Sequence, residues 1–190
     1  MPAPKLSREQ LIDRCLLVFH RQGFHRTSME DLARECGLQK GSFYYHFRSK
    51  EEILQEGLES VHNYFVERIF SLAHDTTETP QDRLENLLEA CRKEFMDEER
   101  GCIMANMALE TSSTVPAFTP IIQNFFNTWI DALTAILKTK YDDVEATALA
   151  CKSVQQIEGS IMLMRIFKDH SHLMDALSQA YNLLDEAEES

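Results

Sequence analysis

The stretch from Thr27 to Lys50, TSMEDLARECGLQKGSFYYHFRSK, constrains the fold of this chain more than any other segment. It predicts two short helices around a tight turn, because Ser28 can cap the first helix and Gly37 is a natural left-handed residue at its end. In the second helix, Phe43 and Phe47 are four residues apart and therefore share one inward face. The segment thus predicts a small helix-turn-helix unit.

The opposite face of the second helix carries groups that suit the major groove of DNA. Gly41 lets the backbone come close to a partner, Lys40 and Ser42 can reach base edges, and Tyr45 offers a ring for thymine methyl groups. Exposed aromatic side chains are unusual on an inert surface. The residues expected to reach phosphates around this face are Ser28, Tyr44, His46 and Lys50.

The charge distribution agrees with this interpretation. Residues 1–50 hold nine Lys and Arg against five Asp and Glu, whereas residues 51–190 hold ten against twenty-six. A polyanion is attracted to the first region and repelled by the second. The chain as a whole has a net charge of −12, but its N-terminal region is basic.

Apolar residues recur at steps of three and four along almost the whole chain, which predicts an all-α protein with about nine helices. Three helices fall in the basic N-terminal region, the first running from the Ser7 capping box to Gly23. A long helix is expected from the Ser49 cap to about Ala73. The later helices are expected from Pro80 to the acidic run at Asp97, over 102–111, from the Pro120 region to about 141, from 143 to about 168, and from Ser171 onward.

In these residues the sequence resembles the tetracycline-repressor (TetR) family of bacterial transcriptional regulators. The matching elements are Gly23-Phe24, Thr27-Ser28, Asp31-Leu32-Ala33, Gly37-Leu38, the run from Lys40 to Phe47, and Ser49-Lys50-Glu51. The match is dense over residues 6–66. The resemblance implies a DNA-binding domain over 6–66, with its helix-turn-helix at about 28–47, and an effector-binding and dimerisation domain over 67–190.

Carried over residue by residue, the resemblance implies DNA contacts from Ser28, Lys40, Gly41, Ser42, Tyr44, Tyr45, His46 and Lys50. Gln39 departs from the Ser or Thr common at the start of the recognition helix, so its own contact with DNA is an open alternative. Gly101-Cys102, followed by an apolar helix and Glu110, is similar to one subgroup of the family.

The acidic region holds the candidates for an effector site. Its aromatic and Met residues can line an apolar pocket, although such stripes more often form plain core. Gln155, Gln156 and Glu158 interrupt an apolar run, and a buried polar group needs a partner, which is an effector, Arg165 or a second subunit. The candidate effector residues are Phe95, Cys102, Met104, Met107, Phe125, Trp129, Gln155, Glu158 and Met162.

The last two helices, over about 143–188, are the expected homodimer interface. Small residues such as Ala146, Ala150 and Gly159 permit close helix approach, and Leu173 and Leu177 form a stripe on the final helix. Two such pairs would build a four-helix interface. Two-fold symmetry then sets two recognition helices about 34–36 Å apart and predicts a palindromic operator in double-stranded DNA.

Five scattered cysteines without paired spacing favour reduced thiols in a cytoplasm over a disulfide framework. Cys102 follows Gly101 at an expected helix N-terminus, where a thiolate is favoured, so a sensor of electrophiles or oxidants is one alternative and a small core residue is the other. The histidine pairs His20 with His25 and His170 with His172 lack partners at metal-ligand spacing, so we expect neither a metal site nor a cofactor.

Together these patterns predict a cytoplasmic, dimeric repressor that is released from DNA by an unknown small apolar effector. The sequence contains no enzyme motif such as HExxH, GxSxG or a P-loop, so we expect no catalytic activity. It has no apolar run long enough to cross a membrane and no apolar signal region. A small-molecule carrier that kept the fold is the alternative from a different class.

Overall fold

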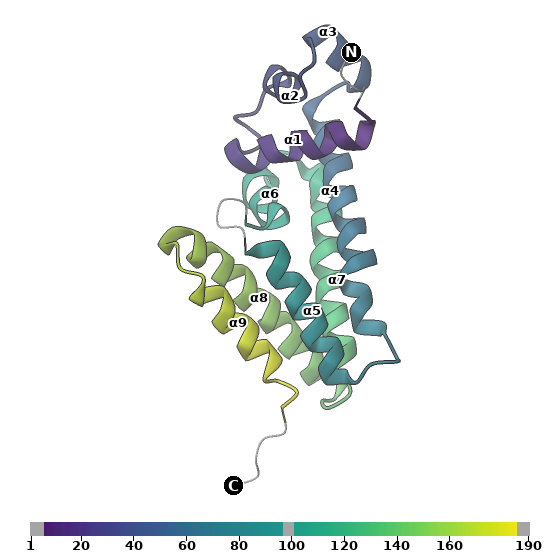
Figure 1. The fold of residues 1–190 in the computed structure, drawn as a ribbon, viewed down its shortest axis with the longest axis vertical. Coiled ribbons are helices and arrows are strands. Elements are labelled where there is room, and N and C mark those ends of the chain that lie inside the picture. Colours follow the sequence, from purple (N-terminus) through teal and green to yellow (C-terminus); the bar gives the residue numbers. More distant parts are fainter. Residues whose placement is uncertain (1–5, 97–100, 186–190) are drawn as a thin grey trace. The chain divides into compact units, whose positions relative to one another are not determined.

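The computed structural model describes residues 6–96 and 101–185. Within these ranges the chain is all-helical, with nine α-helices, two short 3-10 helices and no strand (Figure 1). The predicted fold class and the number of helices are therefore confirmed. The chain packs into two compact units, one made of the residues up to 62 together with 103–122, the other of 63–102 together with the residues from 123 onward.

The first unit contains α1 (Arg8–Gln22), α2 (Met29–Glu35), α3 (Lys40–His46), the start of α4 (Lys50–Arg68), α6 (Ile103–Thr111), η2 (Pro116–Phe118) and the start of α7 (Thr119–Leu137). The predicted capping box begins α1, since the Gln10 N–H donates to Ser7 Oγ over 3.2 Å and the Ser7 N–H donates to Gln10 Oε1 over 2.9 Å. Gly23, with φ of +79°, ends this helix. The buried side chains Phe19, Phe24, Leu32, Phe43, Phe47 and Ile53 belong to the core of this unit.

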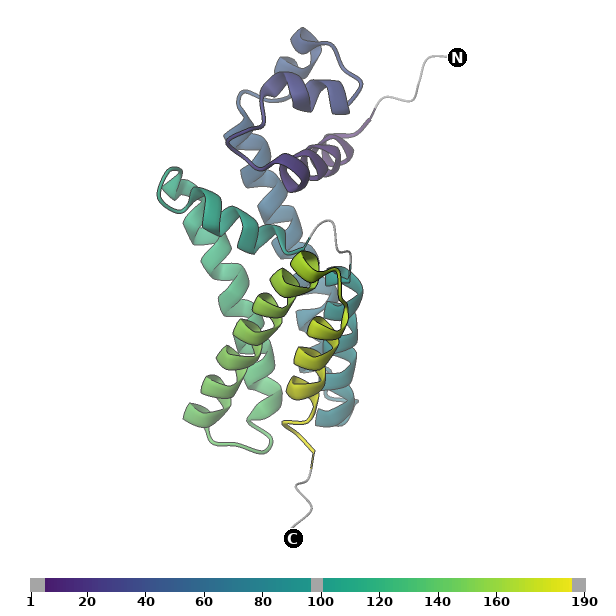
Figure 2. The same ribbon diagram turned by 90° about the vertical axis from the view of Figure 1, so that its left-hand side faces the viewer.

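The second unit contains the end of α4, η1 (Phe70–His74), α5 (Pro80–Phe95), most of α7, α8 (Asp143–Phe167) and α9 (Ser171–Tyr181). Helices α8 and α9 lie side by side, and α9 also packs on α5 (Figure 2). The predicted caps hold here too, because Thr79 Oγ1 accepts from the Asp82 N–H over 3.1 Å and Asp142 Oδ1 accepts from the Glu145 N–H over 2.9 Å.

Stacked aromatic rings fill the centre of the second unit. Phe65 and Phe125 have ring centroids 5.0 Å apart, and Phe95 and Trp129 are 5.6 Å apart. Phe70 completes the cluster, 6.1 Å from Trp129. Aromatic pairs at such distances stabilise a fold by about 0.5–1.5 kcal/mol each beyond the apolar area they bury. These five rings, which we call the aromatic cluster, form a central part of the core of this unit.

The long helix expected from Ser49 to Ala73 is shorter than predicted. It ends at Arg68, and a separate 3-10 helix follows from Phe70 to His74. This turn brings the Phe70 ring into the aromatic cluster. The Arg83 guanidinium donates to the Ala73 carbonyl over 3.1 Å and so satisfies a terminal acceptor of the 3-10 helix. Tertiary packing therefore overrides a local pattern that reads as one continuous helix.

Several residues of the interface stripes expected on the last two helices are buried within the protomer. Ala146, Ala150 and Ser160 of α8 are buried within the protomer, as are Leu173 and Leu177 of α9. The large apolar side chains that α8 and α9 leave exposed are instead Val144, Met162, Ile166, Phe167 and Met174. Apolar residues lie on both the buried and the exposed sides of α8, so periodicity alone did not show which of them pack inward. Residues 186–188 of the predicted interface segment lie outside the described residues.

The two compact units also cut the chain differently from the expected boundary at residue 66. The segment 103–122 packs with the N-terminal helices although it lies far along the sequence. The Glu110 carboxylate makes one of the contacts that hold it there, described below.

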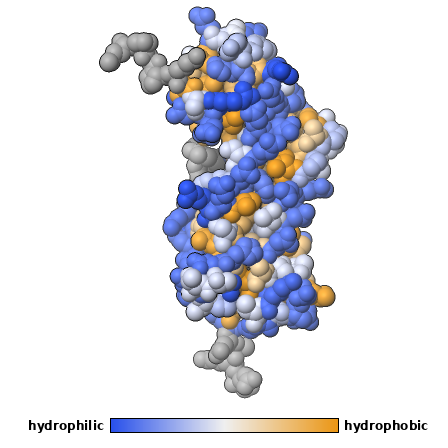
Figure 3. Space-filling model, turned by 90° about the vertical axis from the view of Figure 1, so that its right-hand side faces the viewer, coloured by the Kyte–Doolittle hydropathy of each residue, from blue (hydrophilic) through white to orange (hydrophobic). Residues whose placement is uncertain are grey.

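None of the described helices combines the length and the apolar character that a membrane span requires. On the face drawn in Figure 3, hydrophilic residues predominate and apolar ones form separate patches.

Candidate nucleic-acid interface

Helix α3 is a short amphipathic helix with one buried face. Phe43 and Phe47 are 0% and 1% exposed, and their ring centroids are 5.3 Å apart. On the other side, Tyr45 is 89% exposed and Tyr44 is 46% exposed. A tyrosine this exposed gains no stability from burial, so its presence needs another explanation.

The structure brings most of the predicted DNA-contacting residues to one exposed surface, which we call the α3 face. The α3 face consists of Gln39, Lys40, Gly41, Ser42, Tyr44 and Tyr45, all exposed, with His46 half-buried at its edge. A Cβ atom added at Gly41 would meet no protein atom within 4 Å. Packing inside the protein therefore does not require glycine here, which leaves close approach of a partner as the physical reason for it.

The turn between α2 and α3 sets the direction of the recognition helix. Gly37 has φ of +68°, a left-handed conformation that other residues rarely adopt. The Leu38 N–H donates to the Ala33 carbonyl over 2.9 Å, and the Gly37 N–H donates to the Arg34 carbonyl over 3.1 Å. These bonds close the end of α2 and fix where α3 begins.

Gln39 occupies the N-cap position of α3, and its side chain makes no capping hydrogen bond. The departure from Ser or Thr at this position thus removes a cap and leaves an exposed amide at the margin of the α3 face. An amide carries both donor and acceptor groups and suits a base edge or a phosphate.

Ser28 is exposed, and its hydroxyl is already engaged in the capping box of α2. It accepts from the Asp31 N–H over 3.2 Å and donates to Asp31 Oδ2 over 2.6 Å. The bonds that the Ser28 hydroxyl and the Ser28 N–H donate to the Asp31 carboxylate, helped by Arg34, lower the pKa of Asp31 to about 2. Ser28 therefore lies beside a carboxylate that stays ionised at neutral pH. A phosphate contact at Ser28 remains a prediction.

Lys50 differs from the exposed cation expected at this position. Its half-buried ammonium donates to the carbonyls of Phe24 over 2.8 Å and Thr27 over 3.0 Å, and it lies 4.3 Å from the Phe24 ring centroid. Lys50 thus fastens the loop between α1 and α2 to the start of α4. This arrangement favours a positioning role, and its direct contact with phosphate stays a prediction.

Glu110 of α6 holds the same loop from another side. Its carboxylate accepts from the Phe24 N–H over 2.9 Å and from the His25 N–H over 2.8 Å. A Cβ at Gly23 would lie 2.7 Å from Glu110 Oε2, so glycine is required there by this carboxylate as well as by its positive φ. Reasoning from the sequence noted Glu110 only as a subgroup resemblance and did not assign this contact.

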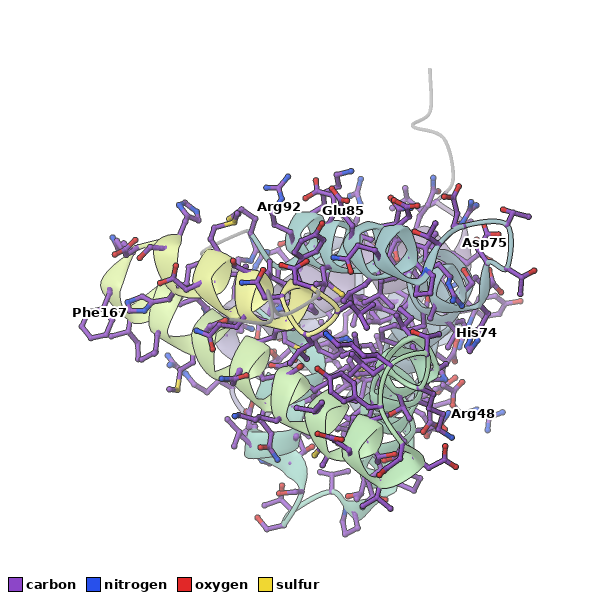
Figure 4. All side chains as sticks on the ribbon, turned by 90° about the horizontal axis from the view of Figure 1, so that it is seen from below. Arg48, His74, Asp75, Glu85, Arg92 and Phe167 are labelled. Atoms are coloured by element: carbon purple, nitrogen blue, oxygen red, sulfur yellow. The ribbon has the colours of Figure 1, made fainter. Side chains whose placement is uncertain are left out.

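Two arginines near α3 were not among the predicted contacts. Arg8 pairs with Glu52 over 3.0 Å, donates to the His46 carbonyl and lies 4.4 Å from the Phe47 ring centroid, so it braces the end of α3. Arg48, which follows α3 directly, is exposed; it is among the residues labelled in Figure 4. Its position in sequence next to the recognition helix was the available signal.

The predicted effector residues are divided between the two units. Phe95, Phe125 and Trp129 belong to the aromatic cluster, whereas Met104 and Met107, both buried, belong to the first unit. Gln155 is exposed, with its amide donating to Cys151 Sγ over 3.5 Å, and Met162 is 55% exposed.

Glu158 is the polar residue of the second unit that stands out. Burial raises its pKa to about 7, and a hydrogen bond with the Cys102 thiol opposes this shift. Among the described residues, Glu158 Oε1 is shielded from solvent and has no hydrogen-bond partner, and the same holds for the Trp129 indole nitrogen. Unsatisfied buried polar atoms are rare and call for an explanation such as a ligand.

In the described part of the chain, no group of three or more His, Cys, Asp or Glu residues is placed to hold a metal ion.

Comparison with known proteins agrees with this architecture. Residues 11–56 match the family model described as bacterial regulatory proteins, tetR family, and residues 80–179 match the one described as transcriptional regulator LmrA/YxaF-like, C-terminal domain.

Similar whole proteins are regulators too. The chain is 26% identical over 173 residues to the uncharacterized helix-turn-helix transcriptional regulator YxaF of Bacillus subtilis, covering 88% of this chain and 90% of that protein. It is 23% identical to the transcriptional repressor DhaR of Mycobacterium sp., covering 93% and 91%. A TetR transcriptional regulator from Legionella pneumophila, 18% identical, has the same fold with a TM-score of 0.85 over 96% of this chain and 100% of that one. The chain therefore belongs to the TetR family and is a helix-turn-helix DNA-binding transcriptional regulator.

Proposed function

We propose that the protein is a homodimeric repressor that binds a palindromic operator through the α3 face and leaves it when a small apolar effector binds the second unit. The observation that carries the DNA-binding part is Tyr45, which is 89% exposed on a helix whose opposite face is fully buried. In this arrangement Lys40, Ser42 and Tyr45 read base edges in the major groove. Tyr44, His46 and the exposed Arg48 lie beside them to contact phosphates.

The dimer interface is proposed on the exposed apolar residues of α8 and α9. Met162, Ile166 and Phe167 are 55%, 65% and 64% exposed, and Met174 of α9 is 44% exposed. Figure 4 shows Phe167 at the end of α8, pointing away from the densely packed side chains. Gly159 lies between Gln155 and Met162 on the same side of the helix and lets a second helix approach closely. Contiguous apolar surface of this kind marks an interaction site.

The effector is proposed to be apolar and to carry a hydrogen-bond donor. Glu158 Oε1 is an acceptor without a partner among the described residues, and the aromatic cluster of the same unit supplies apolar contacts. Helix α4 starts in the first unit and ends in the second, so a shift of α4 can carry the signal along one continuous element. A coupling of about 1–3 kcal/mol changes operator affinity about 5- to 150-fold.

The alternative of oxidant sensing through Cys102 is less favoured by its surroundings. Cys102 is 4% exposed, and its thiol is hydrogen-bonded to the Glu158 carboxylate, so it is shielded from solvent and already engaged with another side chain. A catalytic role and a carrier role are also less favoured, because neither explains the exposed α3 face. We place the protein in the cytoplasm, where a regulator meets its operator.

The test of the DNA-binding proposal is to isolate genomic DNA fragments bound by the purified full chain and to measure their affinity. Tyr45→Ala is expected to weaken binding of the selected fragment by about 1–3 kcal/mol, or about 5- to 150-fold. Glu59→Ala, which changes an exposed residue of α4 away from the α3 face, is the matched control and should bind as the unchanged protein does. Equal binding by Tyr45→Ala and the unchanged chain would refute the proposed interface.

The proposed dimer is tested by sedimentation of the full chain. Ile166→Asp places a charge on the exposed apolar surface and is expected to yield a monomer with weakened operator binding. Val144→Asp changes an exposed apolar residue at the other end of α8. Whether this variant sediments as a monomer or a dimer shows whether the interface extends to that end of the helix. An Ile166→Asp protein that sediments as a dimer would exclude this surface.

A further inference from the structure

Two cysteines lie in contact inside the first unit. Cys15, in the middle of α1, and Cys36, the C-cap of α2, have sulfur atoms 3.7 Å apart. The Cys36 thiol is also 3.7 Å from the Leu11 carbonyl and donates to it. When Cys36 donates to Leu11, its sulfur is left to accept from the Cys15 thiol. The two groups thus form an ordered hydrogen-bond chain from Cys15 to Cys36 to the α1 backbone.

Both cysteines are buried, Cys36 being 3% exposed, and they differ in that Cys36 lines a cleft. Cys15 is 0% exposed and lies fully in the core. Cys36 lines a cleft with a volume of about 920 Å³, whose walls include Leu6, Arg14, Leu38, Ser42, Tyr45 and His46. The cleft therefore reaches from the α3 face to the Cys36 side chain. A small solute that enters it meets Cys36 first.

The charges around the pair are asymmetric as well. The hydrogen bond from Cys15 lowers the pKa of Cys36, and the positive charge of Arg14 acts in the same direction, while burial and Glu35 oppose them. The same hydrogen bond, together with burial, raises the pKa of Cys15. Glu35 is itself paired with Arg21 over 2.7 Å, which reduces its effect on the pair. The thiolate is the reactive form, so Cys36, which lines the cleft, is also the more reactive of the two cysteines.

We propose that Cys15 and Cys36 form an oxidation site for hydroperoxides, in which a disulfide between them moves the turn before α3 and weakens operator binding. This inference rests on the proposed function, since it adds a second input to the same DNA-binding unit. It does not involve Cys102 or the effector.

The chemistry proceeds in two balanced steps. The Cys36 thiolate attacks one oxygen of hydrogen peroxide, the O–O bond breaks, and the products are the Cys36 sulfenic acid and hydroxide, which takes up the proton lost by the thiol. The Cys15 sulfur then attacks the sulfenic sulfur, an S–S bond forms, and the hydroxyl group leaves with the Cys15 proton as water. In sum, two thiols and one hydrogen peroxide give one disulfide and two waters.

Bond formation changes the geometry next to the recognition helix. An S–S bond is about 2.05 Å long, so the two sulfurs must approach by about 1.6 Å. Cys36 directly precedes Gly37, whose left-handed conformation sets the start of α3. Cys15 lies in the middle of α1, whereas Cys36 lies at the end of α2 beside the turn, so most of the movement falls on Cys36 and the turn. A shift of this size in the turn changes the direction of α3 against a fixed α1.

The experiment uses the full chain bound to its selected operator fragment. The protein is treated with excess hydrogen peroxide, its remaining thiols are alkylated, and the digest is analysed by mass spectrometry without reduction. A linked peptide pair containing Cys15 and Cys36 is expected, with operator affinity reduced about fivefold or more and restored by dithiothreitol.

Three variants separate the roles of the cysteines. Cys36→Ala is expected to leave Cys15 unmodified and operator binding insensitive to peroxide. Cys15→Ala is expected to stop at a Cys36 sulfenic acid, which dimedone traps, without a disulfide. Cys151→Ala removes a half-buried thiol of α8 and should respond as the unchanged protein does. Circular dichroism verifies that each variant is folded. The peptide map of the unchanged chain tests for the disulfide even if a variant fails to fold.

The outcomes are distinct. Absence of the linked pair, or oxidation confined to Cys102 or Cys151, overturns the oxidation site. A linked pair with unchanged operator affinity overturns its regulatory effect. If the reduced protein binds no DNA fragment, the proposed function fails, while the peptide map still decides whether the two cysteines form the site.

Discussion

The two units of this protein place their aromatic side chains in opposite ways. In the first unit, α3 exposes Tyr44 and Tyr45 on a helix of only seven residues. In the second unit, the rings of the aromatic cluster pack against one another and are all at most 6% exposed. Buried rings contribute to stability, whereas a ring as exposed as that of Tyr45 contributes little to it.

The largest effect expected from this comparison is on the stability of the second unit. Trp129 is fully buried and stacks at 5.6 Å on Phe95 and 6.1 Å on Phe70. Trp129→Ala should lower the free energy of unfolding by about 3–5 kcal/mol, because it removes the largest ring and leaves a cavity. Urea unfolding measures this loss. A change below about 1 kcal/mol would mean that the site already contains space, as an open effector pocket would.

A somewhat smaller effect is expected from Glu158 and depends on pH. Its folded-state pKa of about 7 lies above the ordinary value of 4.5. The unfolded chain therefore releases this proton first, and the contribution of Glu158 to stability falls as pH rises from about 4.5 to about 7. Glu158→Gln should be nearly neutral at pH 5 and should stabilise the protein at pH 8 by on the order of 2–3 kcal/mol.

Urea unfolding of both proteins at the two pH values measures this difference. Glu94→Gln, at a carboxylate that accepts from the Tyr64 hydroxyl over 2.7 Å near the surface, is a control for removing one charge. If Glu158→Gln changes stability equally at both pH values, then Glu158 does not titrate in this range.

A third prediction concerns Lys50 in the first unit. It distinguishes a residue that positions the loop between α1 and α2 from one that contacts a DNA phosphate. Lys50→Met removes two charge-assisted hydrogen bonds to the loop between α1 and α2 and is expected to cost about 1.5–3 kcal/mol of stability. A residue that only contacts phosphate would instead leave stability unchanged and reduce the salt dependence of binding by about one unit of slope. Thermal unfolding, together with operator titrations at several salt concentrations, distinguishes the two roles.

The smallest effect on stability is expected at Tyr45. Tyr45→Ala should alter the free energy of unfolding by no more than about 0.5 kcal/mol, as at other exposed positions. The same variant weakens operator binding in the proposed function. A marked loss of stability would show that the ring packs within the protein, and the contrast between the two units would then disappear.

The sequence predicted the local structure well wherever a cap or a turn has a local cause. Ser7, Ser28, Thr79 and Asp142 each accept the expected backbone N–H, and Gly37 adopts the expected positive φ. These features depend on residues three or four apart, so their geometry follows from the chain itself. The division of α3 into a buried and an exposed face followed from the same short spacing.

Predictions that depend on distant neighbours were less complete. Lys50 was expected to be exposed, but its ammonium donates to the carbonyls of Phe24 and Thr27. These residues precede it by 26 and 23 positions in the sequence. Glu110 binds a loop 85 and 86 positions away, and no local pattern announces that contact. On α8, both faces are suited to packing, and only the presence of α9 and the rest of the unit decided which face is buried.

By itself, the sequence determined the helices, their caps, the amphipathic recognition helix and the basic character of the N-terminal region, because each depends on short-range spacing or on composition. The tertiary structure alone decided that residues 103–122 join the N-terminal helices, that the sulfurs of Cys15 and Cys36 touch, and that Glu158 is left with an unsatisfied oxygen among the described residues. The physical reason is that burial and hydrogen bonding between distant segments are set by how helices pack. Periodicity specifies that a helix has an apolar face but not which neighbour covers it.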